Sequence, residues 1–263
     1  MKTIPLYQVD AFASELFKGN PAAVCPLPEW LSQPLMQQIA AENNLSETAF
    51  FVQQGDEFEL RWFTPVDEIP LCGHATLAAG YVLFEHLSYK KDIIIFRSMG
   101  GELLVKKENG KYVLDFPAEM PDPVELTEQV INALKIKPAS LLAGKRKLMA
   151  VLSSEEEVKN IIPDFNLVKE LPHEGVIVTA KGNEADFVSR FFVPRMGINE
   201  DPVTGSAHTL LTPYWAQQLK KTEMKALQLS QRGGELFCRL KNNRVEMAGD
   251  TKLYLEGEIF IPG

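Results

Sequence analysis

The chain has 263 residues, 45% of them hydrophobic and 24% charged, which is enough apolar material for one large domain or two smaller ones. Its 35 acidic and 27 basic residues give a net charge of −8, and the basic residues are scattered, so neither a nucleic acid nor an anionic membrane is expected as a partner. No apolar run approaches a membrane span, the N-terminus has no signal-like segment, and the three cysteines lie far apart. These features predict a cytoplasmic protein with reduced thiols.

The first predicted elements in chain order are strands rich in β-branched and aromatic residues, with one helix among them. The strands are expected at 7–12, 22–27, 48–54 and 58–63, and the helix at 32–43. A second helix over 74–87 is apolar nearly all round, so it is expected to be buried inside a strongly curved sheet. A hairpin over 100–116 turns at Asn109-Gly110.

The second half follows a link at 116–125 that contains three prolines. Its predicted elements are a helix at 127–135, strands at 147–154, 175–182, 186–192 and 226–231, a helix from Ala207, and a hairpin over 233–249 that turns at Asn242-Asn243. Pro213 predicts a kink in the helix that begins near Ala207.

Three pairs of similar segments indicate an internal repeat. Segments 61–65 and 190–194, 73–79 and 205–211, and 100–116 and 233–249 match in the same order, at offsets of 129, 132 and 133 residues. Three matches at nearly one offset favour two copies of one supersecondary unit. The predicted fold is therefore α+β, with two pseudo-symmetric domains at 1–118 and 125–263. Each domain is expected to be a curved, mostly antiparallel sheet around a central helix, and the final strand is a candidate to return to the first domain.

The starts of the two central helices carry the residues that could take part in chemistry. Cys72-Gly73-His74 begins the first helix, and Thr204-Gly205-Ser206 begins the second, shortly after Asp201. A helix N-terminus favours an anion, so two equivalent ones, facing one another across a cleft between the domains, predict a site for a small anionic substrate. Simpler interpretations stay open: Thr204 and Ser206 could cap a helix, His74 could be a structural hydrogen-bonder, and Cys72 a small buried residue.

Several other kinds of site are disfavoured. Cys72, His74 and His208 lack the paired spacing of a zinc site, and the serine after Gly205 does not fit the G-x-S-x-G pattern of a hydrolase. There is no G-x-G-x-x-G motif and no P-loop, so no metal and no nucleotide cofactor is expected.

Glu47 lies where a predicted helix has ended and an apolar strand begins. A half-buried carboxylate at such a place suits general acid/base chemistry, although a glutamate on the surface rim fits the pattern equally well.

Taken together, the motifs GNPAAV (19–24), NLSETAF (44–50), RWFTPVDEIPLCGHATLAA (61–79) and MGINEDPVTGSAH (196–208) resemble the signature of the PhzF-like isomerases of phenazine biosynthesis, which have a diaminopimelate epimerase-like fold. The resemblance runs from residue 5 to near the C-terminus. It implies an isomerase that moves a proton within a small carboxylate-bearing metabolite, without a cofactor and commonly as a homodimer. The alternatives are a non-catalytic binding protein for a small carboxylate and, less favoured, a cysteine-dependent epimerase.

The resemblance also implies roles for particular residues. Glu47 corresponds to the acid/base carboxylate of the family, while His74, Asp201 and Ser206 correspond to residues that bind the substrate or assist proton movement. The backbone N–H groups around Gly73 and Gly205 would hold the substrate's carboxylate.

The related epimerases use two cysteines, one in each domain. Cys72 resembles the first of these cysteines, but the stretch PVTGSA (202–207) has none at the second place.

Overall fold

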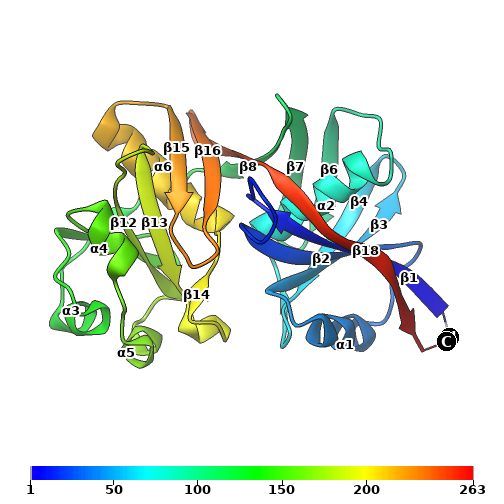
Figure 1. The fold of residues 1–263 in the computed structure, drawn as a ribbon, viewed down its shortest axis with the longest axis horizontal. Helices are drawn as coiled ribbons and strands as arrows, with labels where there is room; N and C mark the ends of the chain where they lie inside the picture. The colour runs from blue at the N-terminus through cyan, green and yellow to red at the C-terminus, as the bar shows by residue number, and fades with distance from the viewer. Residues whose placement is uncertain (1, 263) are drawn as a thin grey trace. The chain divides into compact units, whose positions relative to one another are not determined.

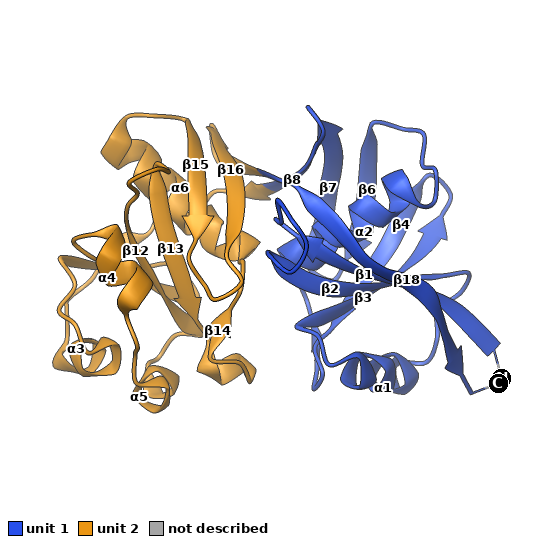
Figure 2. Ribbon diagram, in the orientation of Figure 1, with its two compact units in different colours: residues 1–115, 248–263 blue, residues 116–247 orange. Residues whose placement is uncertain are grey.

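The computed structural model describes residues 2–262 and divides the chain into two compact units. Unit 1 comprises residues 1–115 and 248–263, and unit 2 comprises residues 116–247 (Figure 2). These ranges differ from the expected 1–118 and 125–263 because the last strand of the chain pairs with the first one. Within residues 2–262 no helix is long and apolar enough to cross a membrane.

Unit 1 is a sheet with two helices. Its elements are β1 (Lys2–Ala11), β2 (Asn20–Leu27), α1 (Gln33–Asn43), β3 (Glu47–Gln54), β4 (Glu57–Phe63), β5 (Glu68–Ile69), α2 (Gly73–Glu85), β6 (Ile93–Ser98), β7 (Gly101–Glu108), β8 (Lys111–Pro117), which leads into unit 2, and β18 (Thr251–Ile261). The strands pair in the order β18, β1, β2, β3, β4, β6, β7, β8, with β5 added on β4. The pairs β2–β3 and β4–β6 are parallel, and the others are antiparallel.

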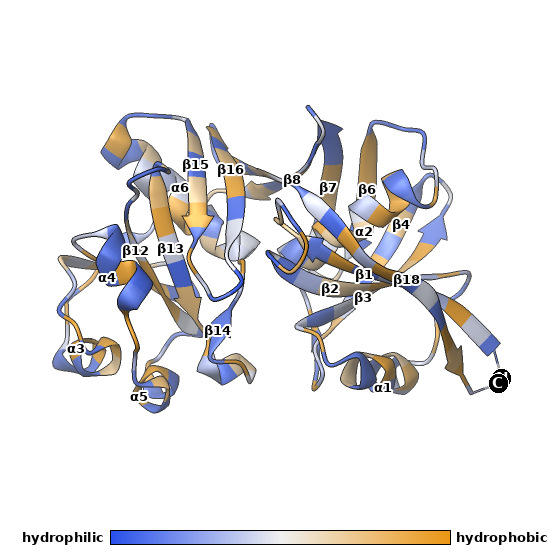
Figure 3. Ribbon diagram, viewed as in Figure 1, coloured by the Kyte–Doolittle hydropathy of each residue, from blue (hydrophilic) through white to orange (hydrophobic). Residues whose placement is uncertain are grey.

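Helix α2 is the apolar centre of unit 1. Ten of its 13 residues are buried, and it contacts β1, β2, β3, β7 and β18, so strands lie on both sides of it (Figure 1). A Cβ at Gly80 would lie 2.6 Å from Cγ1 of Val105, so a glycine allows β7 to approach the helix this closely. Helix α1 instead buries one side, with Met36 and Ile39, and accordingly shows both hydrophilic and hydrophobic bands in Figure 3.

Unit 2 has a sheet with more helices around it. Its elements are β9 (Asp122–Pro123), α3 (Glu128–Leu134), β10 (Ser140–Ala143), β11 (Lys147–Val151), α4 (Glu155–Asn160), α5 (Phe165–Glu170), β12 (Gly175–Lys181), β13 (Phe187–Phe192), the 3₁₀ turn η1 (Pro194–Met196), β14 (Glu200–Asp201), α6 (Gly205–Leu219), β15 (Glu223–Gln228), β16 (Gly234–Lys241) and β17 (Arg244–Gly249). The strands pair in the order β9, β10, β11, β12, β13, β15, β16, with β14 added on β13. The pairs β11–β12 and β13–β15 are parallel.

The two units therefore have the same order of strand pairing. β2, β3 and β4 of unit 1 correspond to β11, β12 and β13 of unit 2, and in each unit the central helix follows a two-residue strand. The parallel pairs also fall at the same places. The repeat in the sequence thus corresponds to a repeated supersecondary unit.

Helix α6 runs as one helix with Pro213 inside it. Because Pro213 has no N–H, the carbonyl oxygen of Thr209 is left without its helical partner. The backbone N–H of Glu119, from the segment that links the halves of the sequence, donates to this oxygen at 3.0 Å. The link thus satisfies the acceptor that the proline leaves open.

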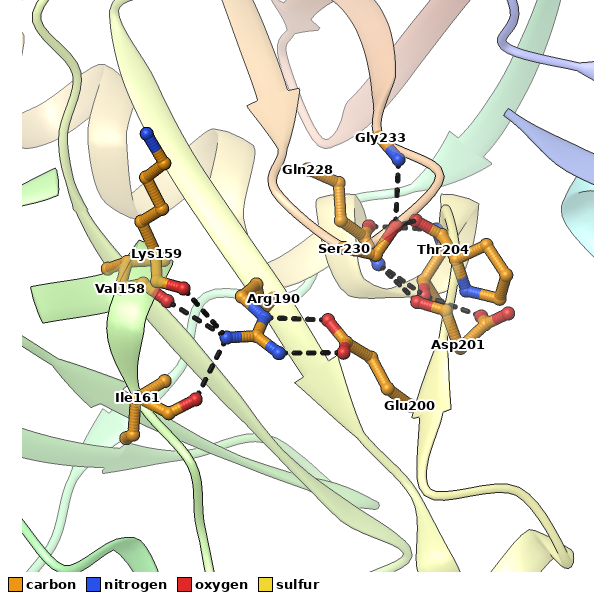
Figure 4. A network of polar contacts seen from close by, with 11 residues as sticks. Val158, Lys159, Ile161, Arg190, Glu200, Asp201, Thr204, Gln228, Ser230 and Gly233 are labelled. Atoms are coloured by element: carbon orange, nitrogen blue, oxygen red, sulfur yellow. Dashed lines mark hydrogen bonds and ion pairs between the residues drawn. The ribbon is translucent and has the colours of Figure 1, made fainter. Parts of the chain in front are cut away.

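One ion pair occurs in both units, at the step from a long strand to the following two-residue strand. In unit 1, Arg61 of β4 donates through Nε and Nη2 to the two carboxylate oxygens of Glu68, both at 2.7 Å. In unit 2, Arg190 of β13 donates to Glu200 in the same bidentate way, at 2.7 and 2.8 Å (Figure 4). Arg190 also donates to three carbonyl oxygens at the end of α4, those of Val158, Lys159 and Ile161. This arginine thus joins β13, the β14 turn and α4.

We expect Arg190→Met to lower the free energy of unfolding by on the order of 2 kcal/mol, since it leaves the mostly buried Glu200 carboxylate and three carbonyl groups without their donor. The measurement is the urea midpoint. The matched control is Arg97→Met, because Arg97 makes a bidentate pair with Glu57 that lies in solvent. A loss of stability in Arg190→Met no larger than that in Arg97→Met would contradict the structural role of the buried pair.

Candidate functional site

Glu47 and His74 are in direct contact in unit 1. Glu47 is the first residue of β3 and His74 the second residue of α2. Glu47 Oε2 and His74 Nε2 lie 3.0 Å apart, and their side chains are only 11% and 5% exposed. Phe50 and Val52 of β3 point to the core that α1 covers, so Glu47, at the opposite parity of the strand, points to the α2 side. The structure therefore brings together two residues that the sequence assigned to one site.

Asn20, the first residue of β2, holds the other side of the imidazole ring. Its Nδ2 lies 3.1 Å from His74 Nδ1, and the residue is fully buried. In the neutral form of the ring, with the amide in this orientation, Nδ1 accepts from the Asn20 N–H and the ring hydrogen is on Nε2, directed to the Glu47 side; a positively charged ring donates from both nitrogens and needs the amide oxygen of Asn20 at Nδ1. Nε2 of His74 and Oε2 of Glu47 are buried and have no hydrogen-bond partner among residues 2–262 beyond this mutual ion-pair contact.

The charge on His74 is linked to that of its neighbours. Burial lowers the pKa of His74, but the neighbouring Cys72 and Glu47 groups outweigh burial, so the pKa is raised well above its ordinary value. Because Cys72 is a neutral thiol at neutral pH, as its own pKa indicates, Glu47 is the charge that acts on the ring under those conditions. The carboxylate at Nε2 therefore favours the positively charged form of the His74 ring.

Cys72 occupies the N-cap of α2 in an extended conformation, and its side chain makes no capping bond. Its Sγ lies 3.5 Å from His74 Nδ1. Burial, followed by the negative charge of Glu47, raises the pKa of the Cys72 thiol to about 11. At neutral pH the group is a protonated, packed thiol and a poor base.

Glu47, Cys72 and His74 bring potential metal ligands within 4.8 Å of one another. Cys72 lies beside Nδ1 of the ring, however, and Glu47 lies beside Nε2. The two ring nitrogens point in different directions, so one ion could bind His74 together with only one of the other two residues. Zinc sites take three or four protein ligands, and this arrangement does not fit one.

In unit 2, the fully buried His208 has Nδ1 2.8 Å from the Thr204 carbonyl oxygen, and burial lowers its pKa to about 4.

Asp201, one of the candidate residues of unit 2, belongs to a hydrogen-bonded turn before α6 (Figure 4). Thr204 Oγ1 donates to Asp201 Oδ2 at 2.5 Å. The buried side chain of Gln228, from the end of β15, accepts from the Thr204 N–H at 2.9 Å and donates to the Asp201 carbonyl oxygen at 2.8 Å. Gln228 thereby fixes the backbone that presents the Asp201 carboxylate.

Gly73 and Gly205 are the first residues of α2 and α6, as their predicted role at anion-binding helix starts requires. Ser206 is the second residue of α6, the place that His74 has on α2, and it is partly exposed. That these residues contact a substrate stays a prediction.

Sequence reasoning missed Asn20 and Gln228 as parts of the site. Asn20 lies within the motif at 19–24, so a signal was present, but its contact with His74 spans 54 residues of sequence. Gln228 is a single glutamine near the end of a predicted strand, with no distinguishing pattern around it.

Cys72 should react slowly with iodoacetamide in the native protein at pH 7. With a pKa of about 11, roughly one Cys72 thiol in 10⁴ is ionised at that pH. We expect its modification, followed by mass spectrometry, to be as slow as that of the buried Cys25 and Cys238 and to accelerate as the pH approaches 10. Fast alkylation of Cys72 alone at neutral pH would show instead that it is an activated thiol.

Comparison with known proteins agrees with the fold. The family model described as phenazine biosynthesis-like protein, PhzC-PhzF, matches residues 9–258. A Pseudomonas aeruginosa protein named an uncharacterized isomerase is 52% identical over 256 residues, covering 97% of this chain and 98% of that protein. The crystal structure of a PhzF family protein from Enterococcus faecalis has a TM-score of 0.96 and 49% identity, covering 99% of this chain and 100% of that one.

A more distant structure has the same fold. It is a hydroxyproline epimerase from Agrobacterium vitis with bound trans-4-hydroxy-L-proline, with a TM-score of 0.62 at 7% identity, covering 98% of this chain and 92% of that one. The predicted α+β, diaminopimelate epimerase-like fold is confirmed by these likenesses. Given a family model that spans nearly the whole chain and a relative with half of its residues identical, this chain belongs to the PhzF family of phenazine biosynthesis-like proteins.

Proposed function

We propose that this protein is a cofactor-independent isomerase that moves a proton within a small carboxylate-bearing metabolite, with Glu47 as the general acid/base. The observation that carries the proposal is the buried contact between Glu47 Oε2 and His74 Nε2 at the start of α2. A carboxylate and an imidazole at 3.0 Å, with little solvent, can hold and release one proton. The relatives named isomerases support the reaction class.

The proposed reaction has two proton transfers and no net change in the enzyme. Glu47 Oε2 is buried against His74, which leaves Oε1 to approach the substrate. Glu47 takes a proton from a carbon of the substrate, and the electron pair of that C–H bond spreads into the conjugated system that includes the carboxylate. The protonated Glu47 then gives the proton to another carbon of the same system, which amounts to a 1,3- or 1,5-shift.

The neighbouring groups prepare Glu47 and the substrate for these transfers. Asn20 fixes the ring of His74, and His74 in turn orients Glu47 and contacts the substrate. The N–H groups at the start of α2, around Gly73, favour the substrate's carboxylate and the charge that builds on it. From unit 2 we assign Asp201, Ser206 and the N–H of Gly205 as further substrate contacts.

Two other functions make different predictions. A cysteine-dependent epimerase needs a thiolate, and the pKa of about 11 for Cys72 disfavours one at neutral pH. A protein that only binds a small carboxylate would not exchange the protons of its ligand with water.

Glu47→Gln should lower the rate of proton exchange by on the order of 10² to 10⁴-fold, because an amide of nearly the same shape cannot accept and return the proton. The ligand is first found by a thermal-shift screen of small carboxylic acids, since a ligand that binds the folded state raises the melting temperature. The measurement is solvent-deuterium incorporation into that ligand, by NMR.

Cys72→Ser is the matched control, at a neighbour of the same histidine, and we expect it to change the exchange rate little. Exchange that survives Glu47→Gln and disappears in Cys72→Ser would assign the base to the thiol. A ligand that binds the wild type without exchange would favour the binding protein.

A further inference from the structure

Lys147, the first residue of β11, points to the side of the unit 2 sheet on which α6 lies. Met149 lies two residues further on β11 and pairs with Ile177 of β12. Ile177 pairs in turn with Phe191 of β13, and Phe191 pairs with Asp201 of β14. Residues paired directly across a sheet share a face, and so do residues two apart on a strand. Lys147 and Asp201 therefore share one face of this sheet.

The packing of α6 identifies this face. Thr179 lies two residues beyond Ile177 on β12, so it belongs to the same face, and its hydroxyl accepts a hydrogen bond at 2.9 Å from the indole N–H of Trp215 in α6. Leu148 and Val176, at the opposite parity, instead join the core with α3, α4 and α5. Lys147 thus lies on the same side of the sheet as the helix that begins at Gly205.

The ammonium group of Lys147 has no carboxylate partner in the part of the chain that the structure describes. It lies 5.9 Å from the centre of the Phe191 ring, and it makes no ion pair or side-chain hydrogen bond within residues 2–262. Three carboxylates are close enough to act on it through space, and each binds another donor. Glu174 pairs with Arg146, Glu119 accepts from the backbone N–H of Lys145, and Asp201 accepts from Thr204.

A partly buried ammonium group without a direct counter-ion is uncommon in a folded protein, because losing water around a charge costs free energy that distant charges return only in part. Burial lowers the pKa of Lys147, partly offset by Glu174. An anion bound against the ammonium group would supply the missing partner.

The other copy of the repeat has no such cation. By strand register, Ala22 beside Glu47 in unit 1 corresponds to Lys147 beside Gly175 in unit 2. A Cβ at Gly175 would lie 2.3 Å from the carbonyl oxygen of Phe192, so no side chain fits at the counterpart of Glu47. The first copy therefore has a carboxylate at this place of the fold, and the second has an ammonium group from the adjacent strand.

We propose that the ammonium group of Lys147 binds an anionic group of the substrate, a carboxylate or a phosphate. Lys147 would thereby select for metabolites that carry such a group. The proposal rests on the proposed function, since it assigns a substrate contact for the same reaction. Lys147 would bind substrate and transition state alike, and would therefore affect KM more than kcat.

The test uses inorganic phosphate and oxalate as dianionic probes and acetate as a monoanionic probe, in titration calorimetry at pH 7 and low salt. Lys147→Met, which keeps the length of the side chain and removes its charge, should weaken phosphate or oxalate binding at least tenfold, or about 1.4 kcal/mol. The matched control is Lys181→Met, at the exposed end of β12 in the same unit, which should bind the probes as the wild type does. Acetate binding that is equally sensitive to Lys147→Met would show that one negative charge suffices.

A second measurement uses the unchanged protein. Acetylation of lysines by an N-hydroxysuccinimide ester, mapped by mass spectrometry, should slow at Lys147 when phosphate or oxalate is present and stay constant at Lys181.

Three results would each overturn the proposal: equal affinities of wild type and Lys147→Met for the probes, no binding of phosphate or oxalate to the wild type, or no protection of Lys147 from acetylation. Probe binding does not depend on Glu47, so Glu47→Gln should bind the probes normally, and a failure of the isomerase proposal would leave this result standing.

Discussion

The bidentate arginine–glutamate pair that occurs once in each unit fixes the geometry on which the candidate site depends. Arg61–Glu68 and Arg190–Glu200 join the end of a long strand to the two-residue strand that follows it. The central helix of each unit begins at Gly73 or Gly205, a few residues later. A planar guanidinium that donates through two nitrogens defines both the distance and the relative orientation of the two strands that it joins. A single contact from a lysine would define only the distance. The ion pair therefore fixes the segment before each central helix to the sheet.

On this repeated scaffold, the residues of the proposed chemistry lie where the two copies differ. His74 follows Gly73 at the start of α2, whereas Ser206 follows Gly205 at the start of α6. By strand register, the residue of unit 2 that corresponds to Glu47 is Gly175. A two-base epimerase needs a base in each copy, on opposite faces of the substrate. The difference between Glu47 and Gly175 instead suits one base that takes a proton from one carbon and returns it to another, with the second copy available for binding.

The sequence could predict the elements whose signals are local. The all-apolar helix at 74–87, the turn at Asn109-Gly110 and the repeat are patterns within short windows, and the structure has each of them. The return of the final strand to the first domain was also expected, and β18 pairs with β1, but its register was not predicted, nor were the short helices α4 and α5, because strand register and a six-residue helix are decided by packing. The same limit applies to the site. The motifs allowed Glu47 and His74 to be assigned to one site. The hydrogen bonds that Asn20 and Gln228 make could not be predicted, because they depend on the register between strands that are distant in sequence.

The two groups that could serve as the base lie on different sides of the same histidine ring. The Cys72 thiol is neutral when protonated, so the apolar surroundings of α2 simply keep its proton, and its pKa rises to about 11. Glu47 is equally enclosed, but it has an imidazole at 3.0 Å whose positive form its charge favours. Glu47 has the Nε2 side of the ring to itself, whereas Cys72 lies on the Nδ1 side, which Asn20 also contacts. In the proposed mechanism, the orientation of one histidine ring, which Asn20 of β2 contacts, therefore favours the carboxylate over the thiol as the group that moves the proton.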